Sequence, residues 1–137
     1  MGRIKFDSDL LKLFSLFESV SGAKIKDCIM GDRITFIAEE NEMGRAIGKN
    51  GANIKKLEFK LNKKVKVIEF SSSVEQFVRN LLYPIEVAGI RNENGLITIA
   101  CRDSNSRAMV IGRERQNINH LAEIVKRYFD IKEIKVA

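Results

Sequence analysis

Two short segments of this chain place glycine, a cation and an amide side chain in the same order. The first, Ala46–Ile54, has the sequence AIGKNGANI, and the second, Val110–Ile118, has the sequence VIGRERQNI, 64 positions later. Glycine leaves the main chain open to close approach, and a cation beside it attracts an anion. This combination predicts a binding site for a phosphate backbone, and its duplication predicts a tandem binder.

In the first segment, Gly48 and Gly51 carry no side chains that would hold a phosphate-sugar backbone away. The N–H groups of residues 49–52 are predicted to point outward at the start of a helix, where partial positive charge favours an anion. Lys49 adds a mobile cation, and Asn50 adds a hydrogen-bond donor. The alternative is a structural corner between two helices, with glycine as a C-terminal cap.

The second segment departs from this pattern, because Arg115 replaces the final glycine and Glu114 adds a negative charge. If this position requires a positive φ, arginine is strained there and glycine is not. Three outcomes stay open: the turn follows a different path, binds more weakly, or binds through the Arg115 side chain. The structural alternative carries more weight here than at the first turn.

Positive charge is concentrated next to the first turn. The whole chain has 24 Lys and Arg against 18 Asp and Glu, a formal net charge of +6 and a pI near 9.4. Residues 45–66 contain eight cations and one acid, Glu58, so this segment has a net charge of +7 and the rest of the chain −1. Such local basicity indicates an anion-binding face. A solvated, lysine-rich helix surface is the alternative.

Hydrophobic periodicity and turn residues predict the same order of elements in both halves of the chain. The first half has predicted helices at 8–20, 43–47 and 52–62 and strands at 24–30, 33–39 and 65–70. The second half has a helical stripe over 74–81, helices at 104–111 and 116–129, and strands at 84–91, 96–102 and 131–136. The predicted N-caps are Asp7 or Ser8 for the first helix, a serine of the run 71–73 for the helix over 74–81, and Asp103 or Ser104 for the helix at 104–111. Residues 92–95 are predicted to form the turn between two strands.

Each half therefore has the predicted order α-β-β-α-α-β. We predict an α+β protein with two modules, residues 1–70 and 74–137, each with a three-stranded sheet packed against helices. The serines at 71–73 are predicted to form a short linker.

This order, with a Gly-x-x-Gly turn between the two central helices, resembles the type II KH domain. The match covers about residues 8–70 and 74–136, and the pair of modules resembles the tandem KH region of the NusA family of transcription factors in its short archaeal form. The two turns agree at five of the eleven positions 47–57 and 111–121, namely the Ile, Gly, Asn, Ile and Leu that both contain. The resemblance implies a ligand of single-stranded RNA, which KH modules bind through this turn.

The resemblance also implies an apolar groove for bases behind each turn, lined by Ile47 and Ile54 and by Ile111 and Ile118. Periodicity alone makes these residues part of the core. In the first module we expect RNA contacts from Arg45, Ile47, Gly48, Lys49, Asn50, Gly51, Ile54 and Lys55. In the second module we expect them from Ile111, Gly112, Arg113, Glu114, Arg115, Asn117 and Ile118.

By this resemblance, the expected function is RNA binding in transcription termination, antitermination or elongation, with RNA polymerase as a candidate partner. A KH-type factor in ribosome assembly or translation is the alternative, because a fold does not fix a function. Phe59 falls off the apolar stripe of its helix, and we assign it no base contact.

Residues suited to catalysis are not gathered in the sequence. His120 is the only histidine and is expected to be exposed; no Cys or Ser has an obvious base partner, and no carboxylate cluster has metal-ligand spacing. We therefore expect no enzymatic activity, no catalytic residue, no cofactor and no metal site. Cys28 and Cys101 are predicted to be free, partly buried thiols.

The sequence contains no apolar run near the roughly 18 residues of a membrane span, and its first residues lack the apolar stretch of a signal peptide. We expect a cytoplasmic monomer without a membrane partner.

Overall fold

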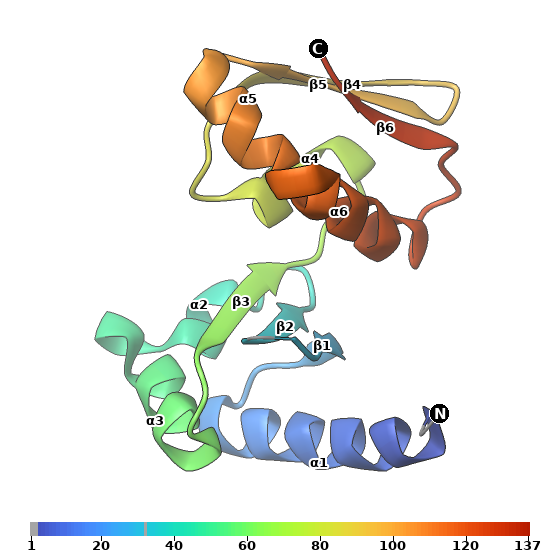
Figure 1. The fold of residues 1–137 in the computed structure, drawn as a ribbon. Coiled ribbons are helices and arrows are strands. Elements are labelled where there is room, and N and C mark those ends of the chain that lie inside the picture. The colour runs from blue at the N-terminus through green and yellow to red at the C-terminus, as the bar shows by residue number, and fades with distance from the viewer. Residues whose placement is uncertain (1–2, 32) are drawn as a thin grey trace. The chain divides into compact units, whose positions relative to one another are not determined.

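The computed structural model describes residues 3–31 and 33–137. The chain divides into two compact units, Met1–Phe70 and Ser71–Ala137 (Figure 1). The first unit contains α1 (Arg3–Ser21), β1 (Ile25–Ile29), β2 (Ile34–Ala38), α2 (Met43–Ile47), α3 (Ala52–Leu61) and β3 (Val65–Glu69). The second contains α4 (Val74–Leu82), β4 (Val87–Glu93), β5 (Leu96–Cys101), α5 (Ser104–Ile111), α6 (Gln116–Lys126) and β6 (Glu133–Val136).

Both units have the predicted element order, and each has one three-stranded sheet, so the predicted α+β class is confirmed. In the first sheet β2 lies in the middle, antiparallel to β1 and parallel to β3, with Phe36 opposite Cys28 and beside Val67. In the second sheet β5 lies in the middle, antiparallel to β4 and parallel to β6. The parallel pair in each unit requires a crossover, which the two central helices provide.

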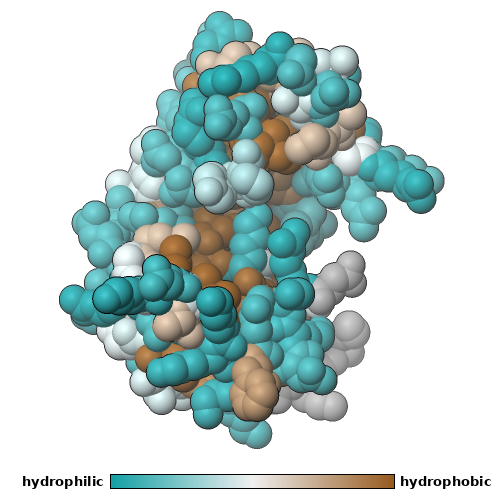
Figure 2. Space-filling view, turned by 90° about the vertical axis from the view of Figure 1, so that its left-hand side faces the viewer, coloured by the Kyte–Doolittle hydropathy of each residue, from teal (hydrophilic) through white to brown (hydrophobic). Residues whose placement is uncertain are grey.

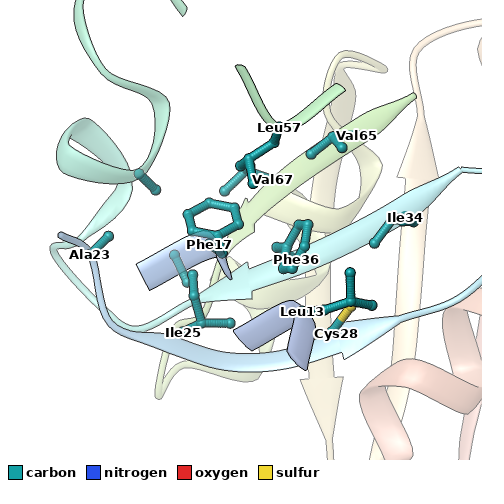
Figure 3. Close-up of a cluster of buried hydrophobic side chains, with 12 residues drawn as sticks. Leu13, Phe17, Ala23, Ile25, Cys28, Ile34, Phe36, Leu57, Val65 and Val67 are labelled. Carbon is teal, nitrogen blue, oxygen red and sulfur yellow. The ribbon is translucent and has the colours of Figure 1, made fainter. Parts of the chain in front are cut away.

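The core of the first unit lies between one face of its sheet and the helices (Figure 3). Leu13 and Phe17 of α1 and Leu57 of α3 pack against Phe36 and Val67 of the strands. Phe17 and Phe36 are fully buried, and their ring centroids are 4.4 Å apart. Leu57 thus fixes α3 to the sheet, and the turn that precedes α3 is anchored at this end.

The predicted apolar stripe of α4 is buried in the second unit. Phe77 and Val78 have no exposed surface, and the Phe77 ring meets those of Tyr128 and Phe129 with centroid distances of 5.7 and 5.8 Å. Val125 of α6 is also fully buried. The helix α6 ends at Lys126, three residues before the predicted end, because the chain tightens into turns that direct both aromatic rings toward Phe77.

Two further boundaries differ from the prediction. The helix α1 begins at Arg3, so Asp7 and Ser8 lie inside it and do not cap it, contrary to the prediction. The propensity of a single Asp or Ser is a weak signal that a longer helix overrides. In the predicted first-unit hairpin, Asp32 lies outside the described residues.

The strand β4 begins at Val87, three residues later than predicted, because Pro84 lacks an N–H for the ladder and the chain there forms a turn closed by the Ile85 N–H on the Leu82 carbonyl. The strand continues to Glu93, so Asn92 and Glu93 are paired and do not belong to the turn as predicted. The hairpin turn is the two-residue Asn94-Gly95, with φ of 56° and 89°, a combination that suits the twist of an antiparallel pair.

No helix within residues 3–31 and 33–137 combines the length and apolar character that crossing a bilayer requires.

Side-chain caps start two helices of the second unit, as predicted. The Ser73 hydroxyl accepts a hydrogen bond from the Gln76 N–H at 3.3 Å and caps α4. The Asp103 carboxylate accepts one from the Ser106 N–H at 2.7 Å and caps α5. This hydrogen bond from the Ser106 main chain lowers the pKa of Asp103 below its ordinary value.

Replacing Asp103 with Ala should destabilise the protein near neutral pH, and the deficit should shrink in acid. Because the folded pKa of Asp103 is lowered, its contribution is present above the unfolded pKa of about 3.9 and is lost as pH falls through the lower folded value. Thermal melts of D103A and the parent protein near neutral pH and at about pH 2 measure this. The matched control is S73A, which removes a cap that does not ionise and should cost about 1 kcal/mol at both pH values. A D103A deficit that stays constant with pH would contradict the assignment.

Candidate nucleic-acid interface

The first glycine turn joins α2 to α3, and buried residues fix both helices. Ala46 in α2 and Leu57 in α3 have no exposed surface. Between them the chain makes a single short 3-10 turn, Lys49–Gly51, at the edge of the first unit (Figure 1). A turn held rigidly at both ends keeps its main-chain groups in fixed positions, which lowers the entropy cost of binding.

The two turns begin along the same backbone path. Gly48 and Gly112 have φ/ψ of 77°/174° and 75°/172°. Two residues later, Asn50 and Glu114 both lie in the left-handed region, at 55°/30° and 54°/32°. The charge that Glu114 adds therefore leaves the backbone of the second turn unchanged.

The path stays the same at the position where Arg115 replaces glycine. Gly51 has φ/ψ of 71°/20° and Arg115 has 63°/20°. The N–H of each donates to the carbonyl of the opening glycine of its turn at 3.2 Å. Of the three outcomes left open by the sequence, a different path for the second turn is wrong. A Cβ added to Gly51 would meet nothing within 4 Å, so a side chain at this position costs backbone strain but no steric overlap.

A hydrogen bond from an asparagine side chain holds each turn closed. The Asn53 side-chain amide donates to the Arg45 carbonyl at 2.9 Å, and the Asn117 amide donates to the Met109 carbonyl at the same distance. Both carbonyls lie near the C-terminal end of the preceding helix, where main-chain acceptors lack partners. Asn117 was predicted to contact RNA, and the structure uses one of its N–H groups to hold α6 against α5.

The same asparagines explain why each turn must open with glycine. A Cβ at Gly48 would lie 2.7 Å from Asn53 Nδ2, and a Cβ at Gly112 would lie 2.5 Å from Asn117 Cγ. Glycine is required here twice, once for its positive φ and once for the space that the asparagine fills. Sequence reasoning noted Asn53 only as a repeated position; its constant spacing of five residues after the glycine was the signal for this contact.

Two of the four predicted main-chain donors are not free. The Gly51 N–H donates to the Gly48 carbonyl, and the Ala52 N–H donates to the Lys49 carbonyl. The expectation that all N–H groups of residues 49–52 point outward is therefore wrong, because the 3-10 turn closes on two of them. The other two predicted donors, the N–H groups of Lys49 and Asn50, come before these two hydrogen-bonded groups in the turn.

The predicted apolar residues differ in how much surface they offer. Ile47 and Ile54 are half-buried, and Ile54 packs against the core. In the second unit Ile111 is half-buried, whereas Ile118 is only 2% exposed. Ile118 is thus a core residue that offers almost no surface to a ligand.

The predicted charged residues are exposed in both turns. Arg45, Lys49 and Lys55 are exposed in the first unit, and Arg45 Nη1 lies 3.9 Å from a carboxylate oxygen of Glu42. The second turn exposes Arg113, Glu114 and Arg115.

The two units differ strongly in the charge around the turn. Glu58, the one acid of residues 45–66, accepts the Val65 N–H at 2.9 Å, so its carboxylate is committed to the main chain of β3. The corresponding residues 109–130 contain four cations and three acids, a net charge of +1 against +7. Figure 2, which faces the side of α2 and α3, shows mostly hydrophilic residues there with smaller apolar areas between them. The cationic surface therefore belongs to the first unit.

The cysteines and the histidine match their predictions. Cys28 is buried and Cys101 partly buried, both are free, and His120 is exposed. Burial, with a smaller effect of the Asp27 charge, raises the pKa of Cys28 to about 12, so its thiol is protonated at neutral pH. The described part of the chain holds no group of three or more His, Cys, Asp or Glu side chains placed to bind a metal ion.

The comparisons with known proteins agree with this geometry. Residues 14–81 match the family model of the KH domain. The probable transcription termination protein NusA of Methanococcus vannielii is 34% identical over 138 residues, covering 98% of this chain and 80% of the relative. The protein of the same name from Halococcus morrhuae is 32% identical and covers 98% of this chain and 99% of the relative. This chain belongs to the family of NusA-like KH-domain proteins.

The similarity is to the short archaeal form, since the chain spans most of the length of both relatives. The crystal structure of APE1850 is also similar, with a TM-score of 0.72 and 28% identity, covering 94% of this chain and 98% of that one.

Replacing Gly48 with Ala should cost more stability than replacing Gly51 with Ala. Gly51 lies in the left-handed helical region, where alanine costs about 1–2 kcal/mol. Gly48, with φ/ψ of 77°/174°, lies in a region that is essentially restricted to glycine, and only there would the new Cβ overlap Asn53. Urea unfolding should show a loss of about 1 kcal/mol for G51A and about 3 kcal/mol for G48A. The double variant G48A/N53A should lose less than the sum of its single variants, because the overlap is removed. Equal losses for G48A and G51A would contradict the steric role of Asn53.

Proposed function

We propose that this protein binds single-stranded RNA and acts with RNA polymerase in transcription termination, antitermination or elongation. The observation that carries the proposal is the first turn: a rigid main chain opened by two glycines, with exposed Lys49 in it and a strongly cationic helix behind it. Relatives over nearly the whole chain are named probable transcription termination proteins, which supports the transcriptional context.

The turn holds the phosphate backbone in this proposal. The N–H groups of Lys49 and Asn50 donate to phosphate oxygens, and the Lys49 ammonium neutralises the charge. Gly48 and Gly51 let the sugar-phosphate chain approach, and exposed Arg45 and Lys55 flank the turn on either side. Bases rest against the exposed parts of Ile47 and Ile54, a surface that suits unpaired bases.

We further propose that both units are KH modules, residues 1–70 and 74–137, joined by the serines at 71–73. The shared element order and the shared path of the two turns support a second module. The second turn contributes Arg113 and Arg115 side chains, with Glu114 offsetting part of their charge. Because Ile118 is buried and the surrounding charge is small, the second unit binds more weakly than the first.

The large complex that the protein accompanies in the cell distinguishes transcription from the alternative of ribosome assembly or translation. Copurification from native extract is the test: RNA polymerase should accompany the protein, and enrichment of ribosomal particles instead would favour the alternative. We also propose that the protein is a cytoplasmic monomer without catalytic activity, in keeping with relatives that are named probable transcription termination proteins.

Affinity for single-stranded RNA should depend strongly on salt. If the two modules neutralise about four to six phosphates, log K should fall with log salt at a slope of about −3 to −4, since each phosphate contributes about −0.7. Fluorescence anisotropy titrations with a labelled oligonucleotide over a series of salt concentrations give the slope. Binding that is independent of salt, or a preference for duplex DNA, would rule out this ligand.

The double variant K49D/N50D should lose about tenfold or more in RNA affinity and keep its melting temperature. Both side chains are exposed, and aspartate tolerates the left-handed conformation of Asn50. RNA titration beside a thermal melt measures both effects.

The matched control is R113D/E114D in the second turn, which should lose less affinity because Glu114 already carries a negative charge. Unchanged RNA binding by K49D/N50D would move the site away from the first turn, and lost folding would make the turn purely structural.

A further inference from the structure

Phe59 is exposed to an extent that core packing does not explain. It is 89% exposed, the highest value among the large apolar side chains described, ahead of Tyr83 at 73% and Leu11 at 67%. It lies on α3, two residues after fully buried Leu57, and so on the opposite side of the helix. Phe59 therefore presents its ring to solvent.

Two lysines share this side of the helix with the ring. Lys55 and Lys56 precede Phe59 by four and three residues, the spacings that bring helical side chains together, and both are exposed. Lys60 follows and is also exposed. Glu58, the one acid among them, is held toward β3 because its carboxylate accepts the Val65 N–H at 2.9 Å.

The fold itself does not require this arrangement. In the second unit the residue 64 positions after Phe59 is Glu123, and those corresponding to Lys55 and Lys56 are Asn119 and His120, all exposed. The corresponding helix α6 thus carries polar side chains at these three positions. The aromatic ring and its lysines are a property of the first unit alone, where the glycine turn is also most cationic.

We propose that the outer face of α3, formed by Lys55, Lys56, Phe59 and Lys60, is a second RNA contact, on which one base stacks against the Phe59 ring while the lysines bind the adjacent phosphates. An aromatic ring accepts any base, and stacking combined with cations is the usual way to hold single strands without reading their sequence. Phe59 lies about 12 Å along the helix from Gly51, at 1.5 Å per residue. An RNA strand leaving the turn continues over this face, and the contact extends the footprint beyond the four nucleotides of a KH turn.

The chemistry of the face favours RNA over a protein partner. A protein groove that receives a helix needs an apolar stripe, whereas this face offers one aromatic ring among three lysines. RNA supplies both a flat π surface and the negative charges that three lysines require. This inference rests on the proposed function, namely that the protein binds single-stranded RNA.

Titrations with RNA of about 4 and about 10 nucleotides test the contact. F59L keeps an apolar side chain but removes the ring, and it should lose about tenfold in affinity for the longer RNA and none for the shorter. F59W keeps an aromatic surface and should bind the longer RNA at least as tightly as the parent protein. K56Q/K60Q, which leaves Lys55 beside the turn intact, should reduce the salt slope for the longer RNA by about 1.4, or two phosphates. Melting temperatures should not change for the Phe59 variants, because the side chain is exposed.

Photocrosslinking the parent protein to RNA with 5-iodouridine near its end provides a test that needs no variant. A crosslink on the peptide containing Phe59 is expected, and crosslinks confined to residues 45–54 would overturn the second contact. If F59L binds both RNAs normally while K49D/N50D loses both, the outer face is not an RNA site and the proposed function still stands. If F59L instead loses a protein from RNase-treated extract, the face is a protein-docking surface. If the parent protein binds neither RNA, both proposals fail.

Discussion

The contact between the opening glycine and the asparagine five residues later is the constraint on which the turn depends. Asn53 fills the space over Gly48 and donates to the Arg45 carbonyl, so it fixes where α3 starts relative to the end of α2. Asn117 and Gly112 repeat this arrangement in the second unit. This arrangement uses only the glycine and the asparagine, and the residues between these two differ in the two units. It therefore supplies one rigid backbone that can carry different side chains.

Because the backbone is shared, the units differ in chemistry only through their side chains. The first unit places an uncharged Asn50 in the turn and a run of lysines behind it, whereas the second places Glu114 in the turn and balances its charges. Phosphate attraction depends on the summed field of nearby charges more than on any one contact. The first unit thus attracts an anion more strongly than the second. The exposed aromatic ring of Phe59 also belongs to the first unit alone, since Glu123 stands at the corresponding position of the second.

Much of this could be predicted from the sequence, for physical reasons that differ by element. The bounds of α2 and α5 were predicted correctly, since a glycine ends each helix sharply. The start of α1 was wrong, because an apolar pattern does not locate the first turn of a long helix. The loss of the Gly51 and Ala52 donors could not be predicted, because it depends on the 3-10 geometry of the turn. The burial of Ile118 against the half-burial of Ile54 depends on how tightly each core packs, which two identical motif residues cannot reveal.

The two glycines of the first turn have different roles, and the second unit separates them. Gly48 cannot be replaced without displacing Asn53, and its counterpart Gly112 is retained. Gly51 faces open space, and its counterpart is Arg115 in the same left-handed conformation. Arginine there costs backbone strain of about 1–2 kcal/mol, and in exchange it adds a cation at the site where a phosphate would approach. A turn without its last glycine is therefore still a formed turn, and the side chain that replaces the glycine changes the charge of the turn without changing its path.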